Sequence, residues 1–546
     1  MNHTMINVEK IKIHNFKCFE DFEISFKKSL NIIVGNNEEG KSTILEALHL
    51  ALSGMYNGKY LGSDITASIF NVNAIERYIS GLKTDQKESL PEIIIEVFLN
   101  GNDIAALQGD DNSESSDACG IRYRVCFNEQ YQNEYAAFVE RDDMSTIPLE
   151  YYKVERTSFA RETITNRSIP LKSVIIDSTS NKYQNGSDIY ISKIIKDDFT
   201  ETELTELSQS FRLLKEQFGA HEAIRKINER ISQKADLTDK QVSISVDTAE
   251  RNSWDNILMT YIDKIPFHQI GKGEQCVIKT NLALSHQKAQ TSNLILLEEP
   301  ENHLSHTNLN VLLDHLVEKC INKQLIITTH SSYVANKLNL NNLILLSNRK
   351  PFHFSSLSED DTRYFEKLPG YDTLRMILSK SSILVEGSSD ELIVQKAFHD
   401  KYGVLPIERG IDVISVRGLS FKRFLSIANK IMCKVAVVTD NDGNFAQKIQ
   451  NKYSDFVGHP TIKICADDKD VLNTLEPQFV EANIDKLEDI RTVLDLSLDN
   501  YSNRDAIVNY MIHNKSEWAL SVFDSEKKFN YPQYILDAIG WVYEGE

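Results

Sequence analysis

The feature that most constrains this chain is a glycine-rich loop between an apolar run and a helical pattern. Residues 30–34 (LNIIV) predict a buried strand, residues 35–42 read GNNEEGKS, and residues 43–53 predict a helix. Backbone N–H groups of such a loop wrap around phosphate oxygens, and the N-terminus of the following helix adds positive potential. The loop therefore predicts a phosphate-binding site at the end of a strand.

Two side chains of this loop have distinct expected roles. Lys41 would reach the β- and γ-phosphates of a bound ATP, and Ser42 would ligate Mg²⁺. The remaining nucleotide-binding candidates in and after the loop are Asn36, Asn37, Gly40 and Thr43.

A second apolar run ends in a row of acids. Residues 293–297 (NLILL) predict a buried strand, and EEPENHL follows at residues 298–304. Glu298 would hold the Mg²⁺ through water, and Glu299 would polarise the attacking water. A solvated acidic turn is the weaker alternative, because three acids directly follow an almost entirely apolar strand.

Two further stretches complete an ordered series. Residues 270–275 (IGKGEQ) place Gly271, Gly273 and Glu274 before an expected helix, and residues 324–329 (QLIITT) predict a strand that leads to His330. The series resembles that of ABC-type ATPases of the SMC type, including their EEPE variant. The resemblance implies that residues 270–275 contact the γ-phosphate bound by another subunit, and that His330 senses this phosphate. Pairing of two heads in a homodimer or higher homo-oligomer is therefore expected; no glutamine can be assigned to the Q-loop.

The rest of this region predicts a mixed domain with an insertion. Residues 7–14 alternate like a strand, and residues 90–99 and 120–127 are rich in β-formers, as in a hairpin lobe. The acidic stretch 107–118 predicts an exposed loop. Residues 199–233 read as charged helices, which either form an arm or dimer contact or are an ordinary surface pair.

Bulk composition narrows the function class. The chain has 546 residues, 41% of them hydrophobic, and a net charge of −19. This charge argues against a simple DNA-coating protein, although a local basic groove can still bind nucleic acid. No apolar run approaches the roughly 20 residues that span a bilayer, and the first residues lack a signal-peptide layout. We expect a cytoplasmic protein without a membrane partner.

Cysteine usage favours buried free thiols over a disulfide framework or a zinc site. The count is odd, and no CxxC pair occurs. The seven positions are Cys18, Cys119, Cys126, Cys276, Cys320, Cys433 and Cys465.

After a mixed connector, strands and helices alternate again. Strands are expected at residues 382–385, 411–416 and 435–439, with helices from about residues 390 and 421. This rhythm predicts a small parallel α/β domain.

Acids stand at the ends of two of these strands. Glu386 follows residues 382–385, and Asp440 and Asp442 follow residues 435–439. Alternate residues of an extended segment point the same way, so Asp440 and Asp442 can share one cation. Paired Mg²⁺ or Mn²⁺ ions at such acids would hold a scissile phosphate and assist its hydrolysis. An Asp-rich turn or helix cap explains either motif alone, but explains both together poorly.

Taken together, the two sets of motifs resemble the OLD (overcoming lysogenization defect) nucleases, which fuse an ABC ATPase to a Toprim domain. The resemblance covers nearly the whole chain. It implies that Asp390, four residues after Glu386, and Glu476 join the metal site, and that Lys515 steadies the transition state. Glu391 competes with Asp390, but its side chain should point elsewhere on the helix.

Other residues near the second motif set allow two interpretations. Thr439 before Asp440 either orients a metal-bound water or packs. Lys515 rests on a short match and is alternatively a solvated lysine. Arg417, Lys422 and Arg423 are candidate phosphate contacts, or the wet face of an amphipathic helix.

The predicted fold class is α/β, with an ABC-type (SMC-like) ATPase domain followed by a Toprim domain. We place the ATPase domain at residues 1–345 with its helical insert at about 196–236, a connector at 346–378, and the Toprim nuclease domain, with a C-terminal helical part, at 379–546. The predicted function is that of an ATP-binding, Mg²⁺- or Mn²⁺-dependent DNA endonuclease whose nucleotide state gates cleavage. The resemblance implies a role in anti-phage defence.

Two alternatives stay open at this point. One is a nuclease held silent by a partner, such as a helicase or a retron reverse transcriptase with its DNA. The other is an SMC-like DNA-repair ATPase whose second domain only binds nucleic acid. A topoisomerase is disfavoured because no separate DNA-breaking domain with a nucleophilic tyrosine is apparent, and a primase would not ordinarily carry an ABC head.

Overall fold

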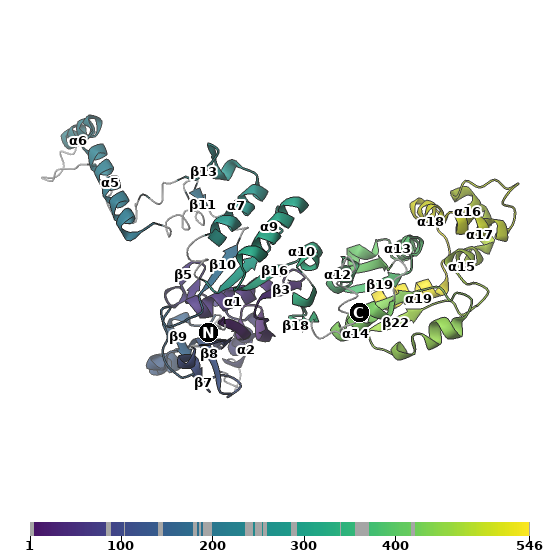
Figure 1. Cartoon of the computed structure of the whole chain (residues 1–546), viewed down its shortest axis with the longest axis horizontal. Coiled ribbons are helices and arrows are strands. Elements are labelled where there is room, and N and C mark those ends of the chain that lie inside the picture. Colours follow the sequence, from purple (N-terminus) through teal and green to yellow (C-terminus); the bar gives the residue numbers. More distant parts are fainter. Residues whose placement is uncertain are drawn as a thin grey trace. The chain divides into compact units, whose positions relative to one another are not determined.

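The computed structural model of the chain resolves into two compact units, each described by itself (Figure 1). The first comprises residues 1–330 and 346–351, and the second comprises residues 331–345 and 352–546. The structure describes residues 5–82, 89–102, 104–139, 146–177, 183–184, 187–188, 199–234, 244–245, 254, 259–285, 292–338, 340–354, 371–416 and 421–544.

An antiparallel sheet forms one layer of the first unit. Its strand order is β2-β1-β6-β8-β7, with β9 also paired to β8. Alternate side chains of β1, such as Ile11 and Ile13, are buried, which is the period expected of a strand with one face in the core. The sheet confirms the predicted hairpin lobe. Its strands are β1 (Asn7–Phe16), β2 (Phe19–Ser25), β6 (Ile93–Asn100), β7 (Gln108–Gly109), β8 (Ala118–Phe127) and β9 (Tyr152–Ser158).

The acidic stretch 107–118 is more ordered than a plain exposed loop. It contains β7, and the buried side chain of Asn112 donates to the carbonyls of Gly109 and Ser116. Asp111 and Glu114 pair with cations of the neighbouring strands. Much of the stretch is exposed, as predicted, but the prediction of a plain loop missed β7, the buried Asn112 and these ion pairs.

A second sheet carries the phosphate loop. Its order is β10-β15-β16-β3-β17-β18, and β10, β15, β16 and β3 run parallel. The strands β3, β15 and β16 are almost wholly buried, as expected of strands covered on both faces. Their carboxyl ends consequently lie at one edge. The strands are β3 (Leu30–Gly35), β10 (Ser173–Asp177), β15 (Leu294–Glu298), β16 (Gln324–Thr329), β17 (Leu343–Ser347) and β18 (Lys350–His353).

Helices of the first unit follow the predicted positions. The helix α1 (Lys41–Ser53) begins directly after the phosphate loop and buries most of its side chains. The predicted insert contains α5 (Glu201–Gly219) and α6 (Glu222–Lys234), and Thr200 and Glu203 form a capping box at the start of α5. The helix α5 buries none of its described side chains, and Figure 1 shows the pair extending from the sheets.

The second unit is built on a four-stranded parallel sheet of order β20-β19-β21-β22. The sheet confirms the small parallel α/β domain that the sequence predicts. Its strands are β19 (Ser381–Val385), β20 (Ile411–Ser415), β21 (Lys434–Val438) and β22 (Ile462–Cys465). The helices α13 (Ser388–Tyr402), α14 (Phe421–Ile431) and α19 (Gln533–Glu544) pack against it.

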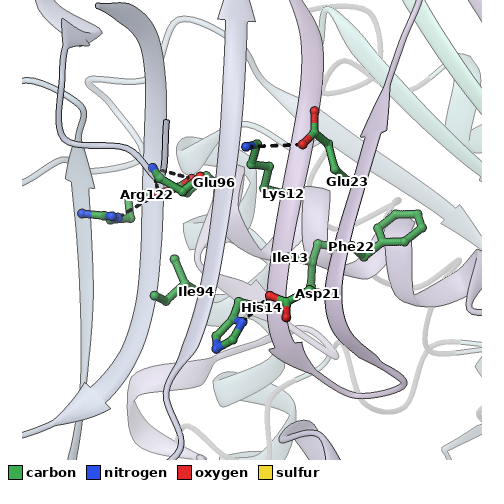
Figure 2. A pocket seen from close by; sticks show the side chains of 10 residues that line it. Lys12, Ile13, His14, Asp21, Phe22, Glu23, Ile94, Glu96 and Arg122 are labelled. Carbon is green, nitrogen blue, oxygen red and sulfur yellow. Dashed lines mark hydrogen bonds and ion pairs between the residues drawn. The ribbon is translucent and has the colours of Figure 1, made fainter. Parts of the chain in front are cut away.

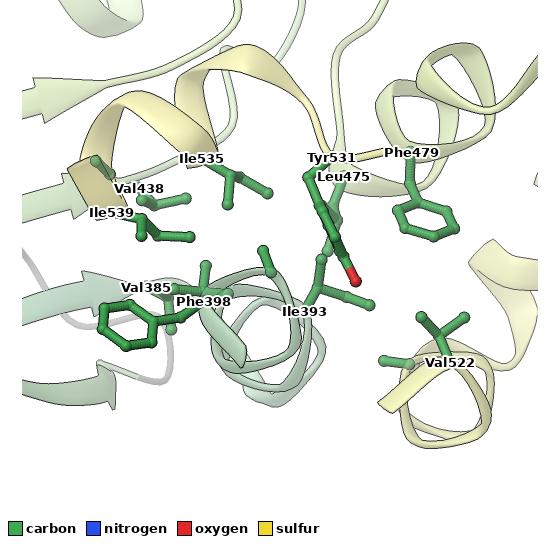
Figure 3. Close-up of a cluster of buried hydrophobic side chains, with 14 of the residues drawn as sticks. Val385, Ile393, Phe398, Val438, Leu475, Phe479, Val522, Tyr531, Ile535 and Ile539 are labelled. Carbon is green, nitrogen blue, oxygen red and sulfur yellow. The ribbon is translucent and has the colours of Figure 1, made fainter. Parts of the chain in front are cut away.

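One hydrophobic core joins this sheet to the C-terminal helices (Figure 3). Phe479 of α15 (Leu475–Ala482) packs with Trp518 of α18 (Lys515–Asp524) at a ring-centroid distance of 5.3 Å. The helix α18 also packs along α13. Removing a buried aromatic ring such as that of Trp518 typically costs about 3–5 kcal/mol. This core therefore fixes α15 and α18 beside the strand ends.

Further helices and strands complete the regular structure of the described residues. None of the helices in the described ranges combines the length and apolar composition of a bilayer-spanning segment. These elements are α2 (Val72–Leu82), α3 (Gln132–Val139), α7 (Lys272–Ser285), α9 (His306–Lys319), α10 (Ser332–Lys337), α12 (Tyr371–Leu378), α16 (Leu487–Val493), α17 (Arg504–His513), β4 (Met55–Tyr56), β5 (Lys59–Tyr60), β11 (Tyr183–Gln184), β12 (Ser187–Asp188), β13 (Tyr261–Ile262) and β14 (Ile265–Pro266).

Candidate functional site

A cavity of about 450 Å³ lies at the phosphate loop in the first unit. It combines loop residues with one strand-end acid and two residues from other turns. Its described lining is Cys18, Asn37, Glu38, Gly40, Lys41, Ser42, Thr43, Glu299 and Arg349. The structure thus brings most of the predicted nucleotide-binding residues of the loop to one space.

Lys41 is held by the loop that it serves. Its Nζ donates to the carbonyls of Gly35 at 2.8 Å and Asn36 at 2.9 Å. Burial lowers the pKa of Lys41, and the nearby carboxylates of Glu299 and Glu301 oppose this shift. Asn36 therefore contributes its backbone carbonyl, which accepts a hydrogen bond from Lys41. A phosphate bound beside the Lys41 ammonium would add negative charge and further favour the charged form of this side chain.

Gly40 is needed for backbone reasons. Its φ is +98°, and a Cβ there would lie 2.5 Å from the Phe19 ring. Glycine alone adopts this geometry without strain, and the loop passes directly into α1. The close packing of the phosphate loop against Phe19 therefore depends on glycine at position 40.

Ser42 and Glu298 meet at the edge of the sheet where the parallel strands β3, β15 and β16 end. The Ser42 hydroxyl donates to Oε1 of Glu298 at the end of β15. Burial raises the pKa of Glu298, and the charge of Asp177 adds to the rise, while the bond from Ser42 opposes it. These groups have the oxygen donors that Mg²⁺ prefers.

Asp177 is a site residue that sequence reasoning missed. It ends β10, and the strand register places it directly beside Glu298. The available signal was an acid after the apolar run of residues 174–176, the same pattern that identified Glu298. Asp177 therefore adds a carboxylate at the expected Mg²⁺ position.

The switch-histidine position lies next to the acids. Nδ1 of His330 is 3.4 Å from Oε1 of Glu299 and 3.4 Å from Oε1 of Glu301. The Thr329 hydroxyl donates to the same Glu301 oxygen at 2.5 Å, and Asn302 donates to Oε2 of Glu299 at 2.8 Å. The structure thus assembles Glu299 and His330 at one edge, as their predicted roles require.

Residues 270–275 lie at the start of α7. A Cβ on Gly273 would lie 2.4 Å from the His303 carbonyl oxygen, so this position excludes other side chains. Gly271, Gly273 and Glu274 are not among the described residues that line the nucleotide cavity.

In the second unit, Glu386 links the ends of two parallel strands. It follows β19, and its Oε1 accepts a hydrogen bond from the Thr439 hydroxyl after β21. The backbone N–H of Asp440 donates to the same oxygen at 3.2 Å. Thr439 thus orients a carboxylate directly, a role that neither of the two sequence-based interpretations, orienting a metal-bound water or packing, had included.

Asp390 lies beside Glu386 in the first turn of α13. Its Oδ2 accepts from the Gly387 N–H at 3.1 Å, which caps the helix. Burial raises the pKa of Asp390 to about 7, and the charges of Glu386 and Glu476 add to the rise. Glu391 instead points toward Arg375, with 4.0 Å between the charged atoms.

Asp440 is the most perturbed acid of the group. Burial raises its pKa to about 9, with further contributions from the charges of Asp390, Glu386, Glu476 and Asp442. Its Oδ1 is buried without a hydrogen-bond partner, and Glu476 on α15 is only 3% exposed. The structure therefore gathers Glu386, Asp390, Asp440 and Glu476 closely enough to repel one another.

Asp442 does not extend the strand, so the geometric basis for its pairing with Asp440 was wrong. The strand β21 ends at Val438, and Asp442 has a φ of +49° before Gly443 at +75°. Asn441, which separates the two acids in the sequence, is fully buried. Its side-chain amide donates to three loop carbonyls. The period-two alternation therefore fails here, because the chain turns immediately after the strand.

Lys448 is a neighbour of Asp442 that sequence reasoning missed. It lies on the π-helical segment Ala446–Asn451, and its Nζ is 3.3 Å from Oδ2 of Asp442. Such segments frequently occur at functional sites. Nothing in the local sequence pattern distinguished this lysine from other surface lysines.

Lys515 reaches the site through its backbone. Its side chain is exposed at the start of α18, and its carbonyl accepts from the Ser389 hydroxyl at 3.0 Å. Ser389 immediately precedes Asp390. The structure therefore places Lys515 next to the helix that carries Asp390.

The predicted phosphate contacts on α14 have mixed positions. Lys422 is exposed and Arg423 is half-buried, while their neighbours Phe421 and Phe424 are buried. This is the pattern of an amphipathic helix. Arg417 lies outside the described residues.

The second site fits divalent metals by its donor set. In the described parts of the chain, no group of three His, Cys, Asp or Glu side chains is already arranged to hold an ion. However, four mutually repelling carboxylates and the unpartnered Oδ1 of Asp440 supply hard oxygen donors. Oxygen-rich sites of this kind suit Mg²⁺ and Mn²⁺.

A further cavity, of about 570 Å³, lies on the antiparallel sheet and is separate from both sets of motifs (Figure 2). Its charged groups pair with one another: Arg122 binds Glu96, and Lys12 binds Glu23. The charged side chains of this cavity are thus engaged in ion pairs, and none of them belongs to either set of motifs. We therefore locate the chemistry at the strand-end sites.

Comparisons with known proteins identify the two domains. Residues 10–265 match the family described as AAA domain, and residues 377–442 match the TOPRIM domain of overcoming lysogenization defect protein-like proteins. The chain is 22% identical over 568 aligned residues to the endonuclease GajA of Bacillus cereus, covering 87% of this chain and 81% of that protein. A shorter match, 38% over 56 residues, joins 10% of this chain to 6% of the DNA double-strand break repair Rad50 ATPase of Pyrococcus abyssi.

Solved structures align with each part at low overall similarity. An SMC head bound to the C-winged helix domain of ScpA covers 65% of this chain and 98% of its own, with a TM-score of 0.33 and 15% identity. The C-terminal region of the Xanthomonas campestris OLD protein covers 31% and 95%, with a TM-score of 0.25 and 18% identity.

The family matches agree with the domain types predicted from the motifs and with the fold class. The chain joins an AAA ATPase domain to an OLD-like Toprim domain and is a homologue of the endonuclease GajA.

Proposed function

We propose that this protein is an ATP-dependent endonuclease that cuts DNA at the acids of its second unit. The two domains and the GajA homology support the enzyme class. The observation that carries the site assignment is the cluster of Glu386, Asp390, Asp440 and Glu476, in which Asp440 has a buried oxygen without a hydrogen-bond partner.

The residues in and around this group would have different roles in DNA cleavage. Bound Mg²⁺ or Mn²⁺ would supply Lewis acidity toward the scissile phosphate. Glu386, Asp390, Asp440 and Glu476 would hold the metal, and Asp442 would complete the donor set from the exposed side. Thr439 keeps the Glu386 carboxylate oriented through its hydroxyl. Lys515 would stabilise charge that develops on the phosphate.

The first unit would bind and hydrolyse ATP. Lys41 would neutralise the β- and γ-phosphates, while Ser42 and Glu298 would hold Mg²⁺. Glu299 would position the attacking water, and His330, 3.4 Å from Glu299, would report on the γ-phosphate. ATP would gate DNA cutting, since phosphodiester hydrolysis itself consumes no nucleotide.

A complete nucleotide site would need two copies of the chain. Gly271, Gly273 and Glu274 are not among the described residues that line the nucleotide cavity of their own chain. A second head would supply them to the γ-phosphate, as the resemblance to SMC-type ATPases implies. We therefore propose a homodimer or higher homo-oligomer that assembles through its heads.

The biological role that we propose is prokaryotic defence against phage DNA in the cytoplasm. The similarity to GajA and to the OLD proteins supports this role. A helicase, or a retron reverse transcriptase with its DNA, is a partner that could hold the nuclease silent.

Cleavage of a supercoiled plasmid tests the function. Wild type, Glu386→Ala and Lys41→Ala are compared in Mg²⁺ and in Mn²⁺, with and without ATP. We expect Glu386→Ala to lose cutting while retaining ATP binding, and Lys41→Ala to lose the response to ATP. Cutting by Glu386→Ala at the wild-type rate would refute the site. No cutting by any variant would favour a nuclease controlled by a partner.

A further inference from the structure

The turn between β17 and β18 contributes an arginine to the nucleotide cavity. Arg349 lines the cavity together with Lys41 and Thr43, although 306 residues of sequence separate Thr43 from Arg349. No motif of the phosphate loop predicts this residue. Its presence adds a cation to a cavity whose other described cation is Lys41.

The backbone of this turn does not itself favour arginine. Asn348 and Arg349 have φ values of +50° and +58°, both in the left-handed region. Two-residue turns of this kind prefer Asn-Gly or Asp-Gly, because a side chain at positive φ is strained. An arginine at the second position therefore requires another explanation than turn formation.

Two hydrogen bonds tie Arg349 to the nucleotide site. Its backbone N–H donates to Oε2 of Glu39, within the phosphate loop, at 2.7 Å. Its Nη1 donates to the carbonyl of Cys18, in the turn after β1, at 3.0 Å. Cys18 in turn contacts the Thr43 hydroxyl at 3.6 Å through its Sγ. The guanidinium is thus directed to the side of the cavity formed by Cys18 and Thr43.

The chemistry of the guanidinium suits a triphosphate. Arginine stays charged and presents its N–H donors in a planar fork that matches phosphate oxygens. The side chain is exposed rather than enclosed by protein, so it can turn toward a ligand in the cavity. Loss of one hydrogen bond between charged groups should therefore weaken binding about tenfold or more.

Arg349 also stands at a boundary in the chain. Residues 346–351 belong to the first unit, and the second unit resumes at Phe352, three residues after Arg349. The β17–β18 turn thus lies next in sequence to the point where the chain passes into the second unit.

We propose that Arg349 is a nucleotide-binding residue that contacts the triphosphate beside Cys18 and Thr43 and makes the β17–β18 turn responsive to ATP. The second half of this statement rests on the proposed nuclease function, whereas the first half does not.

Equilibrium binding of a fluorescent ATP analogue to the full chain tests the first half. Arg349→Ala and Arg349→Gln should weaken binding at least tenfold, and Arg349→Lys should recover part of the loss. Lys350→Ala is the matched control, because Lys350 is exposed and is not among the described lining residues. It should bind within twofold of wild type. Circular dichroism confirms that each variant is folded.

Two results would overturn the binding role: wild-type affinity in Arg349→Ala, or in Arg349→Gln, which retains hydrogen-bond donors but lacks the charge. Plasmid cleavage at increasing ATP concentration tests the second half. The midpoint of the ATP response should move to at least tenfold higher concentration in Arg349→Gln, and an unchanged midpoint would overturn the coupling. If wild type cuts no DNA, the nuclease function fails while the binding result still decides the role of Arg349.

Discussion

The backbone N–H of Asp440 donates to Oε1 of Glu386 at 3.2 Å, across the ends of two adjacent parallel strands. The Thr439 hydroxyl donates to the same oxygen. Glu386 is thus oriented by the neighbouring strand end before any ligand binds. A carboxylate held in this way loses little side-chain freedom when it takes a metal.

Removing the Thr439 hydroxyl should weaken the site without unfolding it. Thr439→Val keeps the shape of the side chain but loses the donor to Glu386. We expect a loss of about 10–100-fold in metal affinity and cleavage rate, as is usual for groups that orient metal ligands. Thr439→Ser keeps the donor and should stay close to wild type. Equal activity of Thr439→Val and wild type would contradict this role.

Divalent metal should stabilise the second unit against heat. A cation would relieve the repulsion among Glu386, Asp390, Asp440 and Glu476. At a metal concentration 100 times Kd, binding to the folded state alone contributes about 2.7 kcal/mol. Calorimetry should therefore show a transition that rises in Tm on adding Mn²⁺ and falls on adding EDTA.

The variant Asp440→Asn is the control for this metal effect. It removes one donor charge from the centre of the group, so its transition should respond much less to Mn²⁺. A rise in Tm equal to that of wild type would show that the metal binds elsewhere.

Asp177 should support ATP hydrolysis. It lies beside Glu298 in the strand register and adds negative charge at the expected Mg²⁺ position. Asp177→Asn should slow ATP hydrolysis about 10–100-fold and raise the Mg²⁺ concentration that half-saturates it. Asp177→Glu, which keeps the charge, should recover part of the rate. An unchanged Mg²⁺ dependence in Asp177→Asn would exclude the role.

Local sequence patterns predicted the strands whose ends carry the candidate site residues. Glu298 and Glu386 each follow a short apolar strand, and the carboxyl ends of neighbouring parallel strands must meet at one edge. Asp442 exposes the limit of such reasoning. Its alternation with Asp440 requires an extended chain, and the turn at Asp442 and Gly443 removes that condition.

The roles of Arg349 and Lys448 could not be predicted from the sequence. Arg349 meets Glu39 and Cys18 across more than 300 residues of chain. Lys448 meets Asp442 only because the intervening chain turns into a π-helical segment. Neither contact leaves a local period or motif, since tertiary packing brings Arg349 to its partners and an irregular local turn brings Lys448 to Asp442.

Adjacent acids on α13 provide the most direct test of the central claim. Asp390 caps the helix beside Glu386, whereas Glu391 points toward Arg375. The measurement is the initial rate of plasmid cleavage in Mn²⁺ by Asp390→Asn and Glu391→Gln, with ATP binding as a check of folding. The account predicts at least a 100-fold loss for Asp390→Asn and a change of no more than about threefold for Glu391→Gln. Equal rates in the two variants would contradict the assignment of the second unit as the DNA-cutting site.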